Sequence, residues 1–452
     1  MKKWWVLLTA LMLALCLCAS ADADSDFSVT IDPGTGYGYI SQYNGTSDHV
    51  TIPATIDGIR IIGIYDGSFG SSGVKSVTIP NGITDISGNP FSRCESLKKI
   101  SVRNDHPTLK IANGALYNKK TDTLLAYPRA STATSYTIPK GTKVIGHSAF
   151  YGSRLQKITI PDTVTAIDVA AFCDCTGLTE MTVPDSVQSI NILAFYGCSS
   201  MVQIYLSAGL ERLGDGVLQD CYSLEAIDLP ASLKVIGDQA FYMCSSLGDV
   251  VLPDGLEVIG DKAFAFCDGF TCIDIPDSVT SIGVNPFVGC TNLYAVNTGA
   301  SSRWINPAGV LIEAQTGTLI CYPCAMQETA YFIGDDVKII GDEAVSRNPY
   351  LQELYICEGV TSLGKGLGTF CDALTTVVIA EGVTIMDEYC FRYLKALTSV
   401  TLPASLTSIS NYCFQYSPNL TLTVPRDSYA AQWAKDNGVQ FMYPDSLDWL
   451  TN

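Results

Sequence analysis

Hydrophobic residues recur along this chain in a pattern that repeats every 23 residues over much of its length. In the unit "LPASLKVIGDQAFYMCSSLGDV", the apolar positions are Leu229, Leu233, Ile236, Ala240, Phe241, Leu247 and Val250. This spacing fits neither the 3.6-residue period of a helix nor the sustained alternation of one long strand. We therefore expect each unit to be a coil of several short elements.

Each coil begins with a short predicted strand. In the stretch 155–161, Leu155, Ile158 and Ile160 point inward. Pro161 closes the strand, because proline cannot donate a hydrogen bond to a ladder and has a fixed φ. A turn, a second short extended segment and a glycine suited to chain reversal follow, as in "DGLEVIG". The stretch "DKAFAFC" then predicts a helical or 3₁₀ turn that places phenylalanine inside.

Thirteen coils can be recognised by aligning the residue that ends the first strand of each. These anchors are Pro53, Pro80, Pro139, Pro161, Pro184, Ser207, Pro230, Pro253, Pro276, Gly334, Cys357, Ala380 and Pro403. One coil alone leaves both of its flat faces exposed to water, so the coils must stack. Parallel strands of successive coils would pair at roughly 4.8 Å and form a sheet along the concave side of a superhelix.

Proline, I-G, A-F, cysteine and leucine recur together at fixed offsets, as in "LPDGLEVIGDKAFAFCDGFTCIDIP". On these residues, the chain from about 50 to 424 resembles the BspA-like (treponemal-type) leucine-rich repeats of secreted and surface proteins of bacteria. The resemblance implies a leucine-rich-repeat solenoid rich in β-structure. Short parallel strands would line its concave side, with short 3₁₀ or helical turns and short extended segments on its convex side. The resemblance also implies binding of proteins or glycans on cells, and no catalytic residue.

Two interruptions and two caps complete the expected organisation. Residues near 101–136 and 297–331 break the register, and the similar stretches "NGALYNKKTDTLLAYPRA" and "AGVLIEAQTGTLICYPCA" predict a hairpin-containing coil in each. Residues 24–50 predict an N-terminal β cap, and residues 51–424 predict the solenoid. Residues 425–452 predict a C-terminal cap with a short helix that starts near Asp427 or Ser428.

Residues 1–23 predict a secretory signal peptide. Two lysines precede an apolar run and then small residues, so we expect cleavage near Ala21 or Ala23. A lipoprotein anchor is disfavoured, because leucine precedes both Cys16 and Cys18. With no second apolar run of about 20 residues, we expect a bacterial protein that is secreted or lies at the cell surface, without membrane insertion after cleavage.

Composition narrows the range of partners. A hydrophobic content of 47% excludes a largely disordered chain, and the formal net charge of −18 repels nucleic-acid phosphates. We therefore expect a monomer that binds no nucleic acid.

Cysteine is a repeat residue of this chain. Eight cysteines share one coil position: Cys94, Cys175, Cys198, Cys221, Cys244, Cys267, Cys290 and Cys371. Other coils carry Ser153, Asn348, Leu394 and Ser417 there, a mixture that neither a metal site nor a disulfide would accept. We expect free, buried thiols packed against backbone carbonyls. For Cys321 and Cys324, in a C-x-x-C pair, both packing and a local disulfide stay open.

The sequence contains no pattern typical of catalysis, cofactor binding or a metal site. We expect His49, His106 and His147 to be surface residues, and the aspartates that follow the prolines, such as Asp162 and Asp185, to be turn residues. A hydrolase that uses scattered acidic residues is a third, weak alternative.

The positions that vary between coils and point outward from the predicted strands, two residues before each anchor, are the ones free to recognise a ligand. We expect a ligand to contact the concave face at Tyr205, Asp228, Val251, Asp274, Tyr355 and Val378. The alternative is that these residues only favour strands. The sequence thus predicts a secreted, non-enzymatic protein that binds a protein or glycan, in host or microbial adhesion. A structural or scaffolding role is the second possibility.

Overall fold

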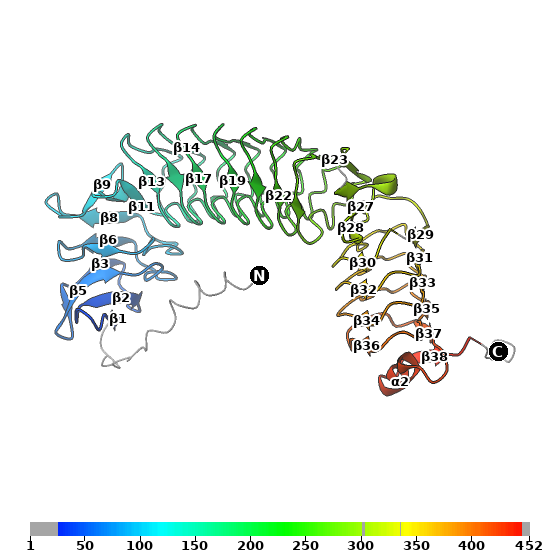
Figure 1. The fold of residues 1–452 in the computed structure, drawn as a ribbon. Helices are drawn as coiled ribbons and strands as arrows, with labels where there is room; N and C mark the ends of the chain where they lie inside the picture. The colour runs from blue at the N-terminus through cyan, green and yellow to red at the C-terminus, as the bar shows by residue number, and fades with distance from the viewer. Residues whose placement is uncertain (1–25, 301–302, 335, 445–452) are drawn as a thin grey trace.

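The protein folds as an arch of stacked coils (Figure 1), known from a computed structural model that describes residues 26–300, 303–334 and 336–444. Three sections make up the arch, which we call the N-terminal arm (26–102), the middle section (109–300) and the C-terminal arm (303–444). Three buried hydrophobic clusters follow this division. The predicted solenoid of short strands is confirmed.

Each coil has three sides, in chain order a long strand, a short strand and a turn side. The long strands hold the "V-x-I-P" type of sequence, in which inward and outward side chains alternate, as in β6 with Val77 and Ile79 buried and Thr78 exposed. The long strands are β3 (His49–Thr51), β6 (Ser76–Ile79), β8 (Lys99–Val102), β12 (Ser135–Thr137), β14 (Lys157–Thr159), β16 (Glu180–Thr182), β18 (Gln203–Tyr205), β20 (Ala226–Asp228), β23 (Cys272–Ile275), β25 (Ala295–Thr298), β29 (Ala330–Ile333), β31 (Glu353–Ile356), β33 (Thr376–Ile379), β35 (Ser399–Thr401) and β37 (Thr421–Thr423).

The short strands follow the anchor residue and bury one side chain each in most coils. They pair in parallel from coil to coil. They are β5 (Ile59–Ile64), β7 (Asp85–Ile86), β13 (Val144–Ile145), β15 (Ala166–Ile167), β17 (Ser189–Ile190), β19 (Arg212–Leu213), β21 (Val235–Ile236), β22 (Val258–Ile259), β24 (Ser281–Ile282), β30 (Ile339–Ile340), β32 (Ser362–Leu363), β34 (Ile385–Met386) and β36 (Ser408–Ile409).

The turn side is a run of hydrogen-bonded turns. In one coil, the backbone N–H of Ala149 donates to the carbonyl of Gly146 at 3.1 Å, and that of Ser153 to Phe150 at 2.9 Å. The coils are also joined along this side, because the N–H of Phe150 donates to the carbonyl of Ala171 at 2.8 Å. Within the described residues, only η1 (Pro307–Gly309) and α2 (Tyr429–Asp436) are helices.

A column of phenylalanine rings fills the core behind the turn side. Phe150, Phe172 and Phe195 stack with ring centroids 5.2 and 5.1 Å apart. The repeat cysteines lie next to this column, and each donates from Sγ to a carbonyl of the coil before it, as Cys198 does to Phe172 at 3.2 Å. All fifteen cysteines among the described residues are free thiols, Cys321 and Cys324 included. The prediction of free thiols bonded to carbonyls is confirmed for the repeat position.

At both interruptions the chain forms an antiparallel hairpin. The strands are β9 (Leu109–Ala112), β10 (Ala115–Asn118) and β11 (Thr123–Ala126) in the first, and β26 (Trp304–Ile305), β27 (Leu311–Glu313) and β28 (Thr318–Cys321) in the second. A tyrosine then takes the place of the core phenylalanine. The N–H groups of Tyr127 and Tyr322 donate to the carbonyls of Ala149 and Ala344, at 2.7 Å in both cases.

Each hairpin coil is two residues short on its turn side. Leu319 pairs with Ile340 of the next short strand, and Tyr322 follows three residues later, whereas five residues lead from Ile340 to Val345 at the equivalent place. The flanking coils therefore touch over the short coil: Asn285 Nδ2 donates to the carbonyl of Glu343 at 2.9 Å. In the first interruption, Leu124 and Tyr127 have the same spacing, and Asn89 Nδ2 donates to the carbonyl of Ser148 at 2.8 Å. The stack bends toward the turn side at both places.

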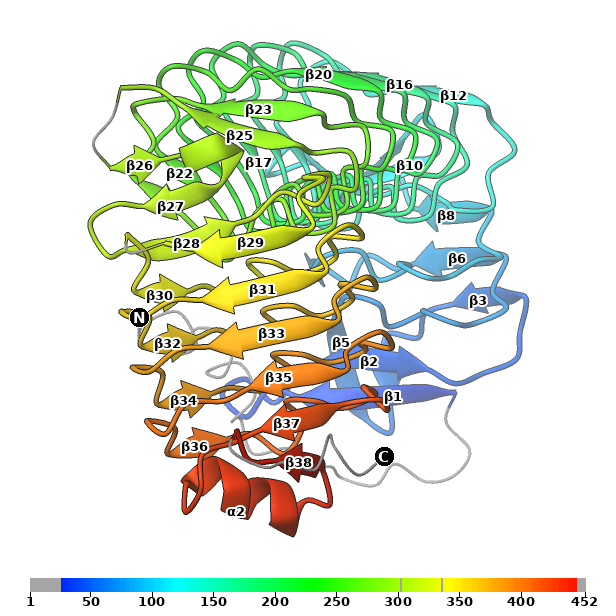
Figure 2. The same ribbon diagram turned by 90° about the vertical axis from the view of Figure 1, so that its right-hand side faces the viewer.

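This bending puts the turn side inside the arch and the long strands outside. Views from two directions place β29, β31, β33, β35 and β37 along the outer edge of the C-terminal arm, and Figure 2 also shows β12, β16, β20 and β23 on the outer edge of the middle section. We expected the strands on the concave side and the turns on the convex side, and that placement is wrong.

Ladder continuity gives the physical reason. The ladder of long strands is broken between β14 and β16 and again between β20 and β23. The ladder of short strands runs unbroken from β13 to β24. Coils that spread apart at their long strands and close up at their turns must curve away from the strands.

Both ends of the stack are covered. At the N-terminus, β1 (Phe27–Ile31) pairs antiparallel with β2 (Gly38–Tyr43), which pairs with β5; β4 (Thr55–Ile56) pairs with β5 on its other side. At the C-terminus, β38 (Gln440–Met442) pairs with β37, and α2 precedes it. The helix is capped by Ser428, whose side chain accepts from the N–H of Ala431 at 3.1 Å. The predicted signal peptide, 1–23, lies outside the described residues.

Candidate binding surfaces

The six residues predicted to contact a ligand lie on the outer side of the arch. Tyr205, Asp228, Asp274, Tyr355 and Val378 are in long strands, and Val251 lies between β20 and β23. The row is exposed as predicted for four of them: Tyr205 is 46% and Val251 86% exposed, and Asp228 and Asp274 are also exposed. These residues therefore face water, but not the hollow of the arch.

The outer row divides into separate groups. Tyr205 and Asp228 are cross-strand neighbours in β18 and β20, while Tyr355 and Val378 are neighbours in β31 and β33 of the C-terminal arm. The ring of Phe332 stacks on Tyr355 with centroids 4.4 Å apart, and Tyr355 donates from its hydroxyl to Glu353 at 2.8 Å. The second bend lies between the two groups, so the structure does not bring the six residues together.

A column of aromatic and arginine side chains lies on the turn side of the C-terminal arm and extends across the second bend to one residue of the middle section. We call it the inner column: Phe266, Arg347, Phe370, Tyr393 and Tyr416, each of which stands directly before the cysteine position of its coil. The guanidinium carbon of Arg347 lies 4.9 Å from the centroid of Phe266 and 4.5 Å from that of Phe370. Phe370, Tyr393 and Tyr416 continue the stack at 4.8 and 4.7 Å, with nearly parallel rings.

A second arginine, Arg392, packs against the column. Arg392 lies over Tyr389 at 4.6 Å and over Tyr393 at 4.4 Å, and its Nη2 donates to the Tyr393 hydroxyl at 3.1 Å. The ring of Tyr412 packs at a tilt against the ring of Tyr389, and Tyr412 is 50% exposed. Tyr416, the last member of the column, is 57% exposed. The free end of this cluster therefore offers tyrosine and arginine together to water, the two residue types that recur in the energetic centres of protein interfaces.

The backbone of the inner column is left-handed. Its φ angles are 61° at Phe266, 66° at Arg347, 62° at Phe370, 61° at Tyr393 and 63° at Tyr416. Three other coils place a glycine at this position, where glycine has no steric cost, and four carry another residue with positive φ: Gly152, Gly197 and Gly289, and Arg93, Asp174, Asp220 and Met243. A side chain with a Cβ costs about 1–2 kcal/mol in this conformation. Gly289 also leaves room for Phe266, since a Cβ on Gly289 would come within 2.6 Å of that ring.

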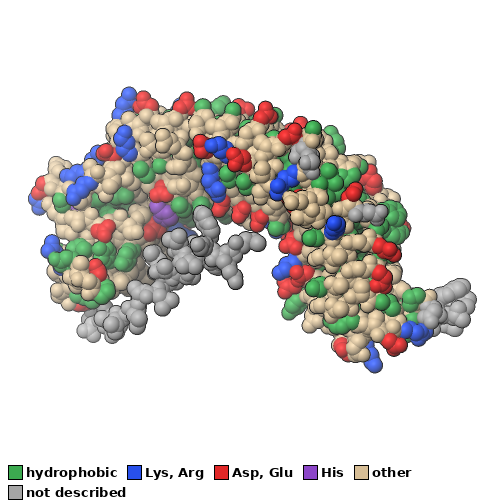
Figure 3. All heavy atoms as spheres, in the orientation of Figure 1, with side chains coloured by type: hydrophobic (Ala, Val, Ile, Leu, Met, Phe, Trp, Pro, Cys, Tyr) green, Lys and Arg blue, Asp and Glu red, His purple; other side chains and the backbone are tan. Residues whose placement is uncertain are grey.

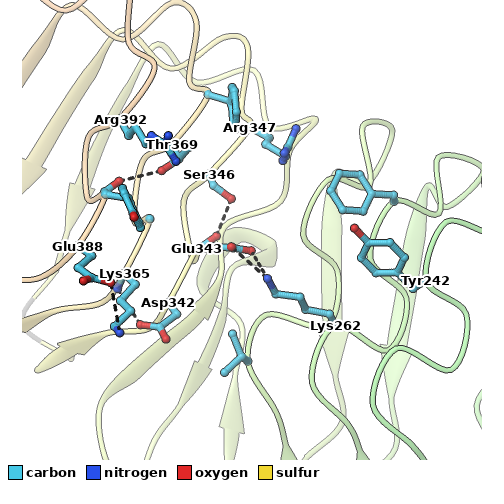
Figure 4. A pocket seen from close by; sticks show the side chains of 15 residues that line it. Tyr242, Lys262, Asp342, Glu343, Ser346, Arg347, Lys365, Thr369, Glu388 and Arg392 are labelled. Carbon is cyan, nitrogen blue, oxygen red and sulfur yellow. Dashed lines mark hydrogen bonds and ion pairs between the residues drawn. The ribbon is translucent and has the colours of Figure 1, made fainter. Parts of the chain in front are cut away.

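A pocket opens where the middle section meets the C-terminal arm, at the second bend (Figure 4). We call it the inner-bend pocket; its volume is about 500 Å³. Lys262 reaches across from the middle section to Glu343, with Nζ and Oε2 2.9 Å apart, and Lys365 faces Glu388 at 3.7 Å. Arg347, Phe370, Tyr389 and Arg392 line the same space, so one end of the inner column forms its wall.

Sequence reasoning missed both the inner column and the pocket. The column was visible as a change at one coil position, from residues such as Gly197 and Asp220 to Phe370, Tyr393 and Tyr416. With the turns predicted on the convex side, such a change has no consequence for binding. His106 is a further correction: it is fully buried instead of at the surface, because its Nδ1 accepts hydrogen bonds from the N–H groups of Thr108 and Leu109.

Over the described ranges, no group of three or more His, Cys, Asp or Glu side chains is arranged to hold a metal ion. In the same part of the chain, no helix is both long and apolar enough to cross a membrane.

Comparison with known proteins gives the following findings. Residues 62–126, 125–247, 212–307 and 321–429 match the family model described as the BspA-type leucine-rich repeat region (6 copies). No curated protein sequence matches the chain. Among solved structures, the pneumococcal vaccine antigen PcpA is 20% identical, with a TM-score of 0.52, over 75% of this chain and 96% of that one. This likeness shows a shared fold.

Two further solved structures match over nearly the whole chain. A leucine-rich cell surface protein from Faecalibacterium prausnitzii is 22% identical over 95% of this chain and 96% of that one, with a TM-score of 0.47. A leucine-rich repeat protein from Bacteroides ovatus is 23% identical over 93% and 98%, also with a TM-score of 0.47.

Proposed function

The chain belongs to the BspA-type leucine-rich repeat family, and from this premise we propose that it is a non-enzymatic binding protein that acts outside the cell. Its partner is a protein or a glycan, and the contact surface is the inner side of the C-terminal arm. The predicted signal peptide of residues 1–23 supports the location. So does the description of PcpA, which shares the fold, as a vaccine antigen.

One observation carries the choice of surface. Five successive members of the inner column place an aromatic ring or an arginine where the backbone is left-handed and where glycine would cost nothing. The left-handed backbone recurs at this position in the other coils, so the side chains distinguish the column: tyrosine and arginine are the residue types that recur in the energetic centres of binding surfaces. Because Tyr412 and Tyr416 are half exposed at the end of the column, they are the contacts we expect a partner to cover.

A structural or scaffolding role is the second candidate function. The observation that favours it is the stacked pair Phe332 and Tyr355 on the outer side, since Phe332 is 63% exposed and faces away from the inner column. An apolar pair in that place would suit a contact between neighbouring proteins of a surface layer.

Two double variants test these surfaces against each other. Tyr412→Ala with Tyr416→Ala removes the exposed end of the inner column, and Tyr205→Ala with Tyr355→Ala removes tyrosines from the outer row. The mature chain and both variants are applied to a glycan array and to an array of purified extracellular proteins. We expect the inner variant to lose at least tenfold in affinity for whatever the parent binds, and the outer variant to keep it.

Melting temperatures of both variants control for folding, and both should stay close to that of the parent. If only the outer variant lost binding, the outer row would be the contact surface instead of the inner column. Concentration-dependent assembly of the parent, abolished by the outer variant, would favour the scaffolding role.

A further inference from the structure

The inner-bend pocket gathers positive charge in a strongly acidic protein. The chain carries a net charge of −18, yet Lys262, Arg347, Lys365 and Arg392 all line this one pocket. Acidic side chains lie along the inner edge of the middle section in Figure 3. In that section Asp215, Asp238 and Asp261 occupy the same place in successive coils, since each of the first two accepts from the N–H of the next. The pocket therefore stands out against the charge of the surface that surrounds it.

The two lysines and the two arginines of the pocket differ in their partners. Lys262 pairs with Glu343 and Lys365 with Glu388. Neither Arg347 nor Arg392 has a carboxylate of the described residues within ion-pair distance. The Nε of Arg392 is buried and its Nη2 donates to the Tyr393 hydroxyl, so Arg347 has the freer N–H groups of the two. The positive charge of the arginines is thus available to a ligand.

Stacking holds both guanidinium groups in a fixed plane. Arg347 lies between the rings of Phe266 and Phe370, and Arg392 lies against Tyr389 and Tyr393. Rings that cover the faces of a guanidinium leave its N–H groups pointing out from the edge. That edge matches a planar carboxylate, which accepts two parallel hydrogen bonds from arginine.

The remaining walls of the pocket accept hydrogen bonds and repel further anions. Asp342, Glu343 and Glu388 line it, and ionised carboxylates act only as acceptors. Sugar hydroxyls can donate to them, whereas the carboxylates of an acidic peptide and the phosphates of a nucleic acid cannot. Arg347 and Tyr393 cover the two faces of Phe370, which is still 37% exposed and so offers its ring edge to the apolar side of a sugar. A volume of about 500 Å³ is within the range of small-molecule sites.

We propose that the inner-bend pocket binds a carboxylate-bearing sugar of an acidic glycan, with Arg347 and Arg392 as the receptors of carboxylate groups and Asp342 and Glu388 as acceptors for hydroxyl groups. This inference rests on the proposed function and names the ligand class for one part of the inner side. It assigns the arginines to the ligand and Lys262, through its pair with Glu343, to holding the bend.

The first experiment compares ligands on the unaltered mature chain. Oligogalacturonide trimers are titrated calorimetrically, and the same trimers with every carboxylate methyl-esterified serve as the neutral match. We expect the acid form to bind at least tenfold more tightly than the ester, and its affinity to fall as salt is added. Equal affinity for the two forms, or no binding of either, overturns the proposal. Tighter binding of a poly-glutamate peptide of equal charge would also overturn it, in favour of an acidic peptide.

The second experiment tests the two arginines. Arg347→Gln and Arg392→Gln should each weaken binding of the acid trimer at least tenfold, and Arg347→Lys, which keeps the charge but not the planar fork, should also weaken it. The control Arg154→Gln removes an exposed charge elsewhere and should change nothing. Unchanged affinity in both glutamine variants contradicts the proposal. If these variants lose nothing while the Tyr412 and Tyr416 variant still loses its array partner, this inference fails and the proposed function stands.

Discussion

Asn285 donates a hydrogen bond from its side chain to the backbone carbonyl of Glu343, which lies 58 residues further along the chain and on the other side of a bend. Its Oδ1 accepts from the N–H of Phe287 in its own coil, so the side chain is held from both ends. Asn89 makes the equivalent bond to Ser148 at the first bend, and both asparagines stand in the sequence Asn-Pro-Phe. The same local sequence thus closes both bends.

Asn285→Ala should destabilise the protein and loosen the second bend. The change leaves the carbonyl of Glu343 without this donor in a half-buried place, so we expect a loss of about 1–3 kcal/mol in the free energy of unfolding. Denaturant titration gives this value, and small-angle scattering should show a larger maximum dimension. Asn292→Ala removes an exposed asparagine hydrogen bond nearby and should cost less than about 0.5 kcal/mol. Equal losses in the two variants would contradict a special role for Asn285.

Serine should replace the cysteine of a repeat better than alanine does. Cys198 donates to the carbonyl of Phe172 at 3.2 Å, and Ser417 makes the same bond to Phe391 at 2.9 Å in its own coil. Cys198→Ala removes the bond and leaves a small void, so it should lose about 1 kcal/mol of unfolding free energy. Cys198→Ser should lose less, as measured by denaturant titration. A larger loss for serine would mean that apolar packing, not hydrogen bonding, decides this position.

Thiol labelling should separate the cysteines into two classes. Cys272 and Cys357 are half-buried, and the other thirteen of the fifteen described cysteines are buried. Burial raises the pKa of Cys371 to about 12 and that of Cys324 to about 11, so little thiolate is present at pH 8. With an aromatic disulfide reagent, we expect two thiols to react in the native protein and the rest only after denaturation. Rapid labelling of many thiols under native conditions would contradict the buried column.

Acid should weaken the first interruption through His106. Burial lowers the pKa of this histidine below its ordinary value of 6.5, and its Nδ1 must be unprotonated to accept from Thr108 and Leu109. Since the unfolded chain binds the proton more readily, stability is full above the ordinary pKa and falls as the pH drops below it.

An NMR titration of the His106 ring checks this, with an expected midpoint below 6.5. In parallel, His106→Asn should reduce the loss of stability between pH 7 and pH 5. A midpoint above the ordinary value, or an unaltered pH profile in the variant, would speak against a buried neutral ring. His147, which lies 3.6 Å from Asp66 across the first bend, has its pKa raised by that carboxylate and so contributes stability in the opposite direction.

The repeat made the coil predictable, because each structural position is sampled many times in one chain. One coil position is identified as buried because it holds phenylalanine in coil after coil, as in Phe150, Phe172 and Phe195. Another holds Cys198 in one coil and Ser153 or Ser417 in others, which identifies a small side chain that donates a hydrogen bond. The exposed row that includes Tyr205 and Val251 followed from alternation within the long strands.

The direction of curvature could not be predicted in this way. It depends on small differences in coil spacing between the sides, and on turns that are two residues short at Tyr127 and Tyr322. The coil spacing is not written in any residue pattern, and the short turn occurs only in the two hairpin coils, so the regular repeat samples neither. The error in curvature then hid the inner column, since Tyr393 and Tyr416 gain their place beside the hollow only from the bend. Burial of His106 was equally invisible, because its partners are backbone groups.

The short hairpin coils have a consequence for how such an arch can evolve. Between them lies a run of units of 22 or 23 residues that share one continuous ladder of short strands, and each unit adds about 4.8 Å to the span. Duplication or loss of one unit in the middle section would change the distance between the two arms in a fixed step, while both Asn-Pro-Phe corners kept their contacts. The width of the opening therefore changes in steps of one whole repeat. It can be matched to the size of a partner without changing any residue that contacts the partner.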